Sequence, residues 1–92
     1  MNRKIDFTNK YKSSYHDEDN NNNLFNRMVA NIKDLYPGKL TFSIEESAKI
    51  LSISPQFLYK KIQTGNIEAL SFGDRKLINI EILANLLTYG VN

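Results

Sequence analysis

The sequence contains no cysteine and no tryptophan, and His16 is its one histidine. Without cysteine there is no disulfide framework and no thiolate zinc site. A single histidine does not make a metal site alone. No metal or other cofactor is therefore expected, and the lack of cysteine fits a reducing compartment.

Long apolar runs are missing as well. No stretch approaches the roughly 20 residues that a membrane-spanning helix needs. The basic start at residues 1–4 is not followed by the hydrophobic segment of a signal peptide. We therefore expect no membrane association and a cytoplasmic location.

The excess of one charge sign is small. Twelve Lys and Arg residues face ten Asp and Glu residues, which leaves a net charge of +2. This is far from the strongly basic balance of a nonspecific polyanion binder.

The residues needed for catalysis are also scarce. One histidine and no cysteine leave no nucleophile with a nearby base, and no glycine-rich phosphate loop is present. Glu45 and Glu46 are adjacent, so on a helix they point about 100° apart and do not form an acid–base pair. We expect that the chain is not an enzyme.

Residues 1–23 have few aliphatic side chains and end in a run of asparagines. Such a segment buries too little apolar area to offset the entropy of ordering. The composition predicts a disordered arm over residues 1–23, with His16 as an untethered tail residue.

Residues 24–36 change to a helical pattern. At 100° per residue one arc of this segment is apolar and contains Leu24, Phe25, Met28, Val29, Ile32, Leu35 and Tyr36. Asn23 can cap the start, and Pro37 followed by Gly38 ends the pattern. The sequence predicts an amphipathic helix over 24–36.

Two short helices with strong start signals follow an extended segment at residues 40–43. Ser43 and Glu46 have the spacing of a capping box, which predicts a helix to about Leu51. Ser54 before Pro55 is a second helix start, and that helix is expected to end at Gln63 or Thr64.

The second of these helices is followed by signals for a hairpin and one more helix. Gly65 and Asn66 end the second helix, and residues 68–72 and 76–78 are expected to be extended around a turn at 73–75. Asn79 can cap a last helix over 80–89. Apolar residues cover about half of that helix, more than one core requires, so we expect the 24–36 helix to pack on it, in the same chain or in another copy.

Two capped helices joined by a three- to four-residue turn are typical of the helix-turn-helix plan, in which the second helix enters the major groove. Residues 40–87 resemble the excisionase-type helix-turn-helix family, which is related to the DNA-binding domain of MerR-type regulators. The resemblance is carried by an acidic pair, small residues and an aliphatic pair at 45–51, and by Leu-Tyr-Lys-Lys-Ile at 58–62 before Gly65. It is also carried by a glycine, basic residues and isoleucine at 73–78, and by Glu81 and Leu83.

The fold that this resemblance implies is mainly α with a small β-hairpin wing. It is a winged helix-turn-helix domain over residues 40–89 with an added N-terminal helix. The sequence departs from the family pattern at Ser52 and Asp74, where glycine is common, and at Leu77, where a basic residue is frequent. These departures make the wing less positive, so DNA affinity is expected to be modest or to depend on a partner.

The candidate DNA-binding residues lie on the second helix and the hairpin: Ser54, Gln56, Phe57, Tyr59, Lys60, Lys61, Gln63, Thr64, Arg75 and Lys76. A glutamine near the start of the helix can pair with adenine, and the lysines suit phosphates. Phe57 either meets a thymine methyl group or covers the turn. Tyr59 is expected to be mostly structural, and the hairpin charges either touch the DNA backbone or only solvate the turn.

The resemblance implies a sequence-specific, double-stranded DNA-binding protein of the nucleoid. Such a protein would be a regulator or an architectural, excisionase-like factor of a phage, plasmid or other mobile element. The implied partners are duplex DNA, a homodimer or cooperative oligomer on DNA, and a recombinase or another protein. Two alternatives stay open: a small transcriptional repressor, and a protein-binding adaptor that kept the fold without DNA binding.

Overall fold

The structure is a computed structural model that describes residues 16–92. Within these residues it contains four helices and one three-stranded antiparallel sheet. The elements in chain order are α1 (His16–Leu35), β1 (Thr41–Ser43), α2 (Ile44–Leu51), α3 (Pro55–Gln63), β2 (Leu70–Phe72), β3 (Arg75–Asn79) and α4 (Ile80–Tyr89). The mainly helical fold with a small hairpin is confirmed. None of the described helices has the length and apolarity to cross a membrane.

Helix α1 is longer than the sequence predicted. It begins at His16 and runs through the asparagine tract, so the predicted disorder of residues 16–23 and the cap at Asn23 are wrong. His16 is the first helical residue and not part of an untethered tail. Residues 1–15 lie outside the described part of the chain. Once the apolar stripe has formed the helix, each added residue gains a hydrogen bond without a new nucleation cost.

Helices α2 and α3 begin at the predicted caps. The Ser43 hydroxyl accepts a hydrogen bond from the Glu46 N–H at 3.1 Å, and Glu46 Oε1 accepts one from the Ser43 N–H at 2.8 Å. The Ser54 hydroxyl accepts a bond from the Phe57 N–H at 3.1 Å, with Pro55 as the first helical residue. These bonds satisfy amides that a helix start otherwise leaves unpaired.

The sheet has the order β1-β3-β2. Phe72 pairs with Arg75, so the hairpin turn consists of Gly73 and Asp74 alone, and Arg75 already belongs to β3. Gly73 has φ +63°, a conformation that glycine adopts without steric cost. The pairing of β1 with β3, in which Phe42 lies opposite Ile78, gives the extended segment at 40–43 a partner that the sequence did not predict.

The core joins α1, β1, α2, α3, β3 and α4, whereas the three residues of β2 are exposed. Its largest fully buried side chains include Phe42, Leu58, Ile78 and Leu83. Helix α2 packs against α3 and α4, and its small residues Ser47 and Ala48 are buried, as expected for a close helix contact. Asn79 caps α4 by accepting a bond from the Ile82 N–H at 2.8 Å, as predicted.

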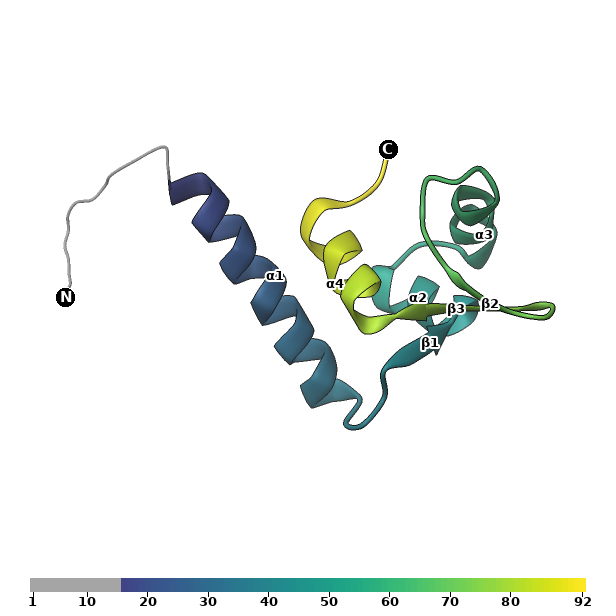
Figure 1. The fold of residues 1–92 in the computed structure, drawn as a ribbon, viewed down its shortest axis with the longest axis horizontal. Coiled ribbons are helices and arrows are strands. Elements are labelled where there is room, and N and C mark those ends of the chain that lie inside the picture. The colour runs from purple at the N-terminus through teal and green to yellow at the C-terminus, as the bar shows by residue number, and fades with distance from the viewer. Residues whose placement is uncertain (1–15) are drawn as a thin grey trace.

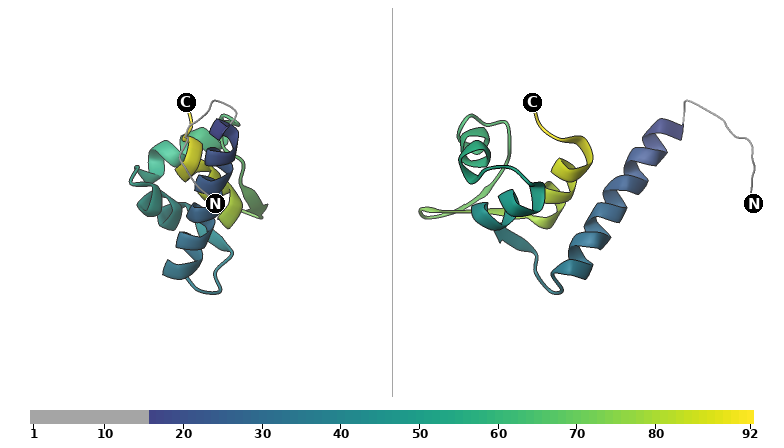
Figure 2. Two further views of the ribbon diagram at one scale, coloured as in Figure 1. Left: turned by 90° about the vertical axis from the view of Figure 1, so that its left-hand side faces the viewer. Right: turned by 180° about the vertical axis from the view of Figure 1, so that it is seen from behind.

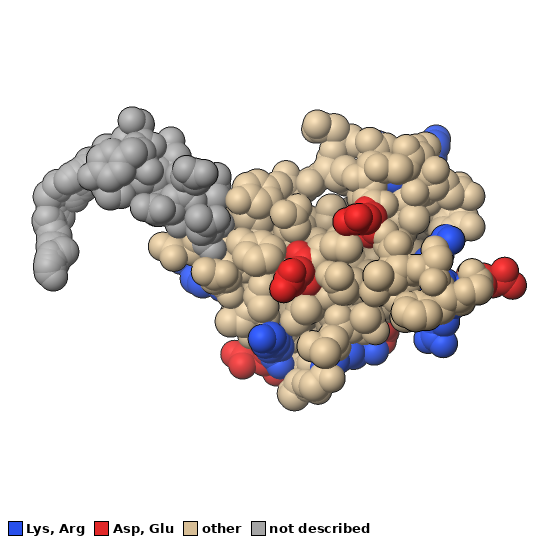
Figure 3. All heavy atoms as spheres, in the orientation of Figure 1, with Lys and Arg blue, Asp and Glu red and all other residues tan. Residues whose placement is uncertain are grey.

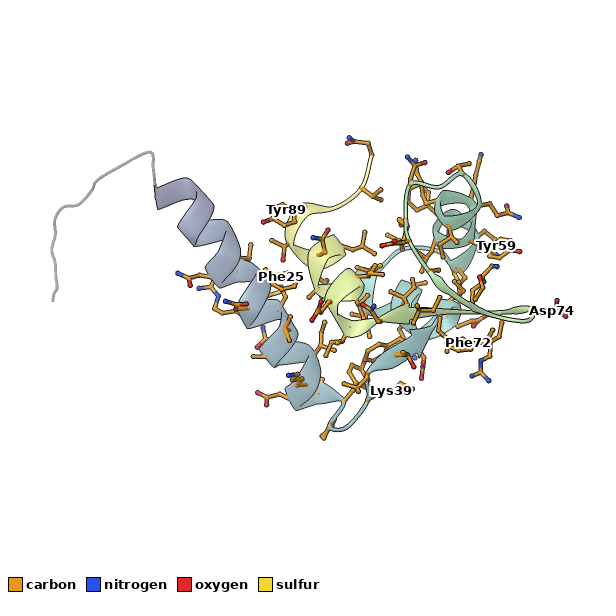
Figure 4. All side chains as sticks on the ribbon, in the orientation of Figure 1. Phe25, Lys39, Tyr59, Phe72, Asp74 and Tyr89 are labelled. Carbon is orange, nitrogen blue, oxygen red and sulfur yellow. The ribbon has the colours of Figure 1, made fainter. Side chains whose placement is uncertain are left out.

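Helix α1 lies alongside α4, and α3 and the β2–β3 hairpin are at the opposite end of the molecule (Figure 1). The view from behind gives the same arrangement (Figure 2). Phe25 points from α1 toward α4 (Figure 4), and Ile32 is buried. The predicted packing of these two helices is therefore present within one chain, and it leaves α3 and the hairpin uncovered by α1.

Candidate nucleic-acid interface

One side of helix α3 packs against the core, and the opposite side is exposed. Leu58 is fully buried and Ile62 is half-buried, as predicted. Four polar residues on the opposite arc are exposed: Gln56, Lys60, Gln63 and Thr64. At 100° per residue, these four residues lie within about a third of a turn of one another around the helix axis. They therefore form a single outward surface.

An open groove of about 560 Å³ separates the start of α3 from the tip of the hairpin. It is lined by Ser43, Ile44, Glu45, Pro55, Gln56, Tyr59, Asp74, Arg75 and Lys76. Tyr59 lies between α3 and the hairpin, and Asp74 projects at the hairpin tip (Figure 4). The structure thus brings four of the predicted site residues around one groove: Gln56, Tyr59, Arg75 and Lys76.

The two basic residues of the hairpin differ in their surroundings. Arg75 is exposed next to the turn. Lys76 is half-buried, and its Nζ donates a hydrogen bond to the Ser71 hydroxyl at 2.9 Å, across the paired strands. Within the described residues Asp74 makes no ion pair with Arg75, although the two are adjacent. The Arg75 guanidinium therefore keeps its bidentate donors available for an anion.

The remaining predicted residues do not share this groove. Phe57 and Lys61 lie on the other flank of α3, where Lys61 Nζ donates to the main-chain oxygen of Asn92 at 2.6 Å and lies 5.4 Å from the centre of the Phe57 ring. The Thr64 hydroxyl is bonded locally to the Lys61 carbonyl and to Asn66 Oδ1. The Ser54 hydroxyl caps α3. The ten predicted residues are therefore divided between the groove, the outward surface of α3, its other flank and its cap.

Five groove residues were not among the predicted site residues: Ser43, Ile44, Glu45, Pro55 and Asp74. The capping box predicted where α2 begins in the sequence. Whether the start of α2 lies beside the start of α3 depends on how the two helices pack, which local residue spacing does not predict. Two of the five are acidic, so the groove carries both signs of charge.

The charge distribution follows from these positions. Lys and Arg atoms lie along the right-hand edge of the molecule in Figure 3, over α3 and the hairpin, and others lie along its lower edge and at the lower left. One acidic group projects at the tip of the hairpin. The pKa of Glu46 lies below its usual value, mainly because the Ser43 backbone N–H donates to the carboxylate. Lys39, whose Nζ lies 3.3 Å from Glu46 Oε2, adds to the shift. Among the side chains that the structure describes, those of residues 23–92, no cluster of His, Asp and Glu is suited to a metal ion.

Comparison with protein-family models, curated proteins and solved structures finds no match to this chain. The resemblance to the excisionase-type family therefore remains a prediction from the residues quoted above. The same holds for DNA binding and for the expectation that the chain is not an enzyme.

Proposed function

We propose that this protein binds duplex DNA as a winged helix-turn-helix domain. In this proposal α3 enters the major groove, and the β2–β3 hairpin is the wing that follows the neighbouring backbone. The observation that carries the proposal is the free polar surface of α3, on which Gln56, Lys60 and Gln63 are exposed and Gln56 faces the groove beside the basic hairpin. Burial of these side chains against the body of the protein would have argued against it.

The size of α3 supports this placement. With its side chains an α-helix is about 10–12 Å in diameter, and the major groove of B-form DNA, about 12 Å wide, admits it. The Ser54 cap and the buried Leu58 hold the helix in place, so the polar surface is rigid before DNA arrives. Helix α1 is at the far end of the molecule and does not obstruct the approach (Figure 1).

The residues divide into two roles. Gln56, in the first turn of α3 and at the groove, is positioned to read a base edge, and a glutamine pairs with adenine through two hydrogen bonds. Lys60, Arg75 and Lys76 supply positive charge for phosphates, which position a protein without reading sequence. Tyr59 separates α3 from the hairpin and offers its hydroxyl to a phosphate.

The biological role that fits is a regulator or an architectural, excisionase-like factor of a mobile element. A small transcriptional repressor would use the same contacts, because both roles rest on the same groove chemistry. A map of bound sites separates them. Repeated sites beside a recombination junction support the first role, and sites that overlap a promoter support the second.

A second candidate function is favoured by the acidic residues of the groove. Glu45 and Asp74 line the groove together with Arg75 and Lys76. The negatively charged carboxylates of Glu45 and Asp74 repel phosphates. A protein-binding adaptor would tolerate this mixture better than a DNA-binding protein. Such an adaptor would not show the steep salt dependence that counterion release gives to DNA binding.

Selection of bound duplexes from a random pool tests the proposal. A shared motif among the selected duplexes supports sequence-specific binding. Gln56→Ala should then reduce discrimination at one base pair by about 1–3 kcal/mol, and Lys60→Ala should weaken binding to all sequences alike. Enrichment of no motif, or an unchanged motif with Gln56→Ala, would count against the proposed role of α3.

A further inference from the structure

Lys61 differs from Lys60, the other basic residue of α3, because its ammonium group already has a partner in the protein. Its Nζ donates to the main-chain oxygen of Asn92 at 2.6 Å and lies 5.4 Å from the centre of the Phe57 ring. Lys61 is therefore hydrogen-bonded within the protein and Lys60 is exposed. The sequence analysis assigns both lysines to DNA binding.

The partner of Lys61 belongs to a short segment, residues 90–92, which we call the strap. Gly90 ends α4 with φ +71°, its N–H donates to the Leu86 carbonyl at 2.8 Å, and the chain then turns toward the α3 side (Figure 1). Val91 is half-buried against the core. It borders a mostly apolar hollow of about 260 Å³ lined by Leu51, Ile53, Phe57, Ile67, Leu86, Gly90 and Val91.

Two contacts therefore hold the strap on the flank of α3: the apolar contact of Val91 and the bond from Lys61 to Asn92. Both contacts are weak enough to be broken, since Val91 is only partly buried and the hydrogen bond lies at the surface. A phosphate would have to draw the Lys61 ammonium group away from the main-chain oxygen of Asn92.

We propose that the strap withholds Lys61 from DNA, so that its release adds one phosphate contact to the interface. This inference rests on the proposed function, since it concerns regulation of the same site. The strap does not cover Gln56 or Lys60. It only sets the number of basic side chains that reach the duplex. It therefore tunes affinity and salt dependence and leaves sequence preference unchanged.

The test compares Lys61→Met with Lys60→Met in the full chain. Both changes remove one charge and keep a long apolar side chain. The probe is a fluorescent mixed-sequence duplex about two helical turns long, and affinity is measured by anisotropy at about 50 mM salt. Lys60→Met should weaken binding by up to about fivefold, and Lys61→Met by less than about twofold.

Loosening the strap completes the test. Val91→Ser should tighten binding by up to about fivefold and make the salt slope steeper by about one. The gain should vanish in the double variant with Lys61→Met. Thermal unfolding shows whether each variant is folded. If Val91→Ser is not folded, the comparison of Lys61→Met with Lys60→Met alone tests the proposal.

The outcomes separate the two proposals. Equal losses from Lys61→Met and Lys60→Met, or no gain from a folded Val91→Ser, would overturn the strap and leave DNA binding intact. Absence of salt-sensitive binding by the unmodified chain would overturn both.

Discussion

Ser43 and Glu46 each bond to the backbone amide of the other at the start of α2, at 3.1 and 2.8 Å. Glu46 also lies 3.3 Å from Lys39, which belongs to the segment between α1 and β1. One carboxylate therefore links the helix cap to the connection from α1. Three of the groove residues, Ser43, Ile44 and Glu45, belong to this helix start, so its geometry also matters for the candidate interface.

The lowered pKa of Glu46 gives a pH-dependent contribution to stability. Because the pKa is lower in the folded state, the stabilisation is fully present above the usual glutamate range, about pH 4.5, and is lost as the pH falls through the folded-state pKa. Glu46→Gln keeps an acceptor for the Ser43 amide but loses the charge.

We expect Glu46→Gln to reduce the free energy of unfolding at pH 7 by no more than about 1 kcal/mol, since the carboxylate is half exposed. The difference should shrink below about pH 4.5. Urea unfolding of both proteins between about pH 7 and 3 measures it. A difference that stays constant down to the lowest pH would contradict the assignment.

The contact between α1 and α4 is expected to stabilise the whole domain. Ile32 is 2% exposed, so Ile32→Ala should lower the free energy of unfolding by about 2–5 kcal/mol. The adjacent, exposed Lys33 provides the control, and Lys33→Ala should change stability by less than about 0.5 kcal/mol. Equal stability of the two variants in urea would show that α1 does not pack on α4 in solution.

Ser52 adopts a left-handed conformation at the end of α2, with φ 60° and ψ 40°. A residue with a Cβ atom is strained there by about 1–2 kcal/mol, and the greater flexibility of glycine in the unfolded chain offsets about half of this. Ser52→Gly should therefore stabilise the protein by about 0.5–1 kcal/mol, which raises Tm by about 2–8 °C.

Ser54→Gly is the matched control for this change, because Ser54 has φ −77° and gains nothing from glycine. Loss of its cap should cost a few tenths of a kcal/mol. Thermal unfolding followed by circular dichroism compares the two variants. A decrease in Tm with Ser52→Gly would show that the strain is absent in solution.

The starts of three helices could be predicted from the sequence because capping depends on residues within one turn. Ser43, Ser54 and Asn79 each bond to an amide three positions along the chain. The apolar arc of α1 and the surplus apolar surface of α4 also predicted their contact. These features are set by local spacing and by amphipathic periodicity.

Other features could not be predicted because they depend on distant partners. The pairing of Thr41 with Asn79 and the bond from Lys61 to Asn92 join segments that have no local signal for each other. The helical start at His16 was missed because low apolar content was taken as disorder.

The candidate interface was predicted only in part for the same reason. The sequence indicated the exposed side of α3, but it did not separate Lys60 from Lys61. It also did not indicate that Glu45 joins Arg75 at one groove. Residue types and helical periodicity predict which side of an element is polar, whereas the groove depends on the packing of three elements.

The central claim is that Lys60 and Arg75 contact phosphates, and the salt dependence of DNA binding tests it most directly. The measurement is the Kd for a mixed-sequence duplex between about 50 and 200 mM salt, for the unmodified chain, Lys60→Ala, Arg75→Ala and Lys33→Ala. Affinity should fall steeply with salt, and each of the first two changes should flatten the slope of log affinity against log salt by about one. Lys33→Ala, at the far end on α1, should leave the slope unchanged. A slope near zero, or an equal effect from Lys33→Ala, would contradict the account.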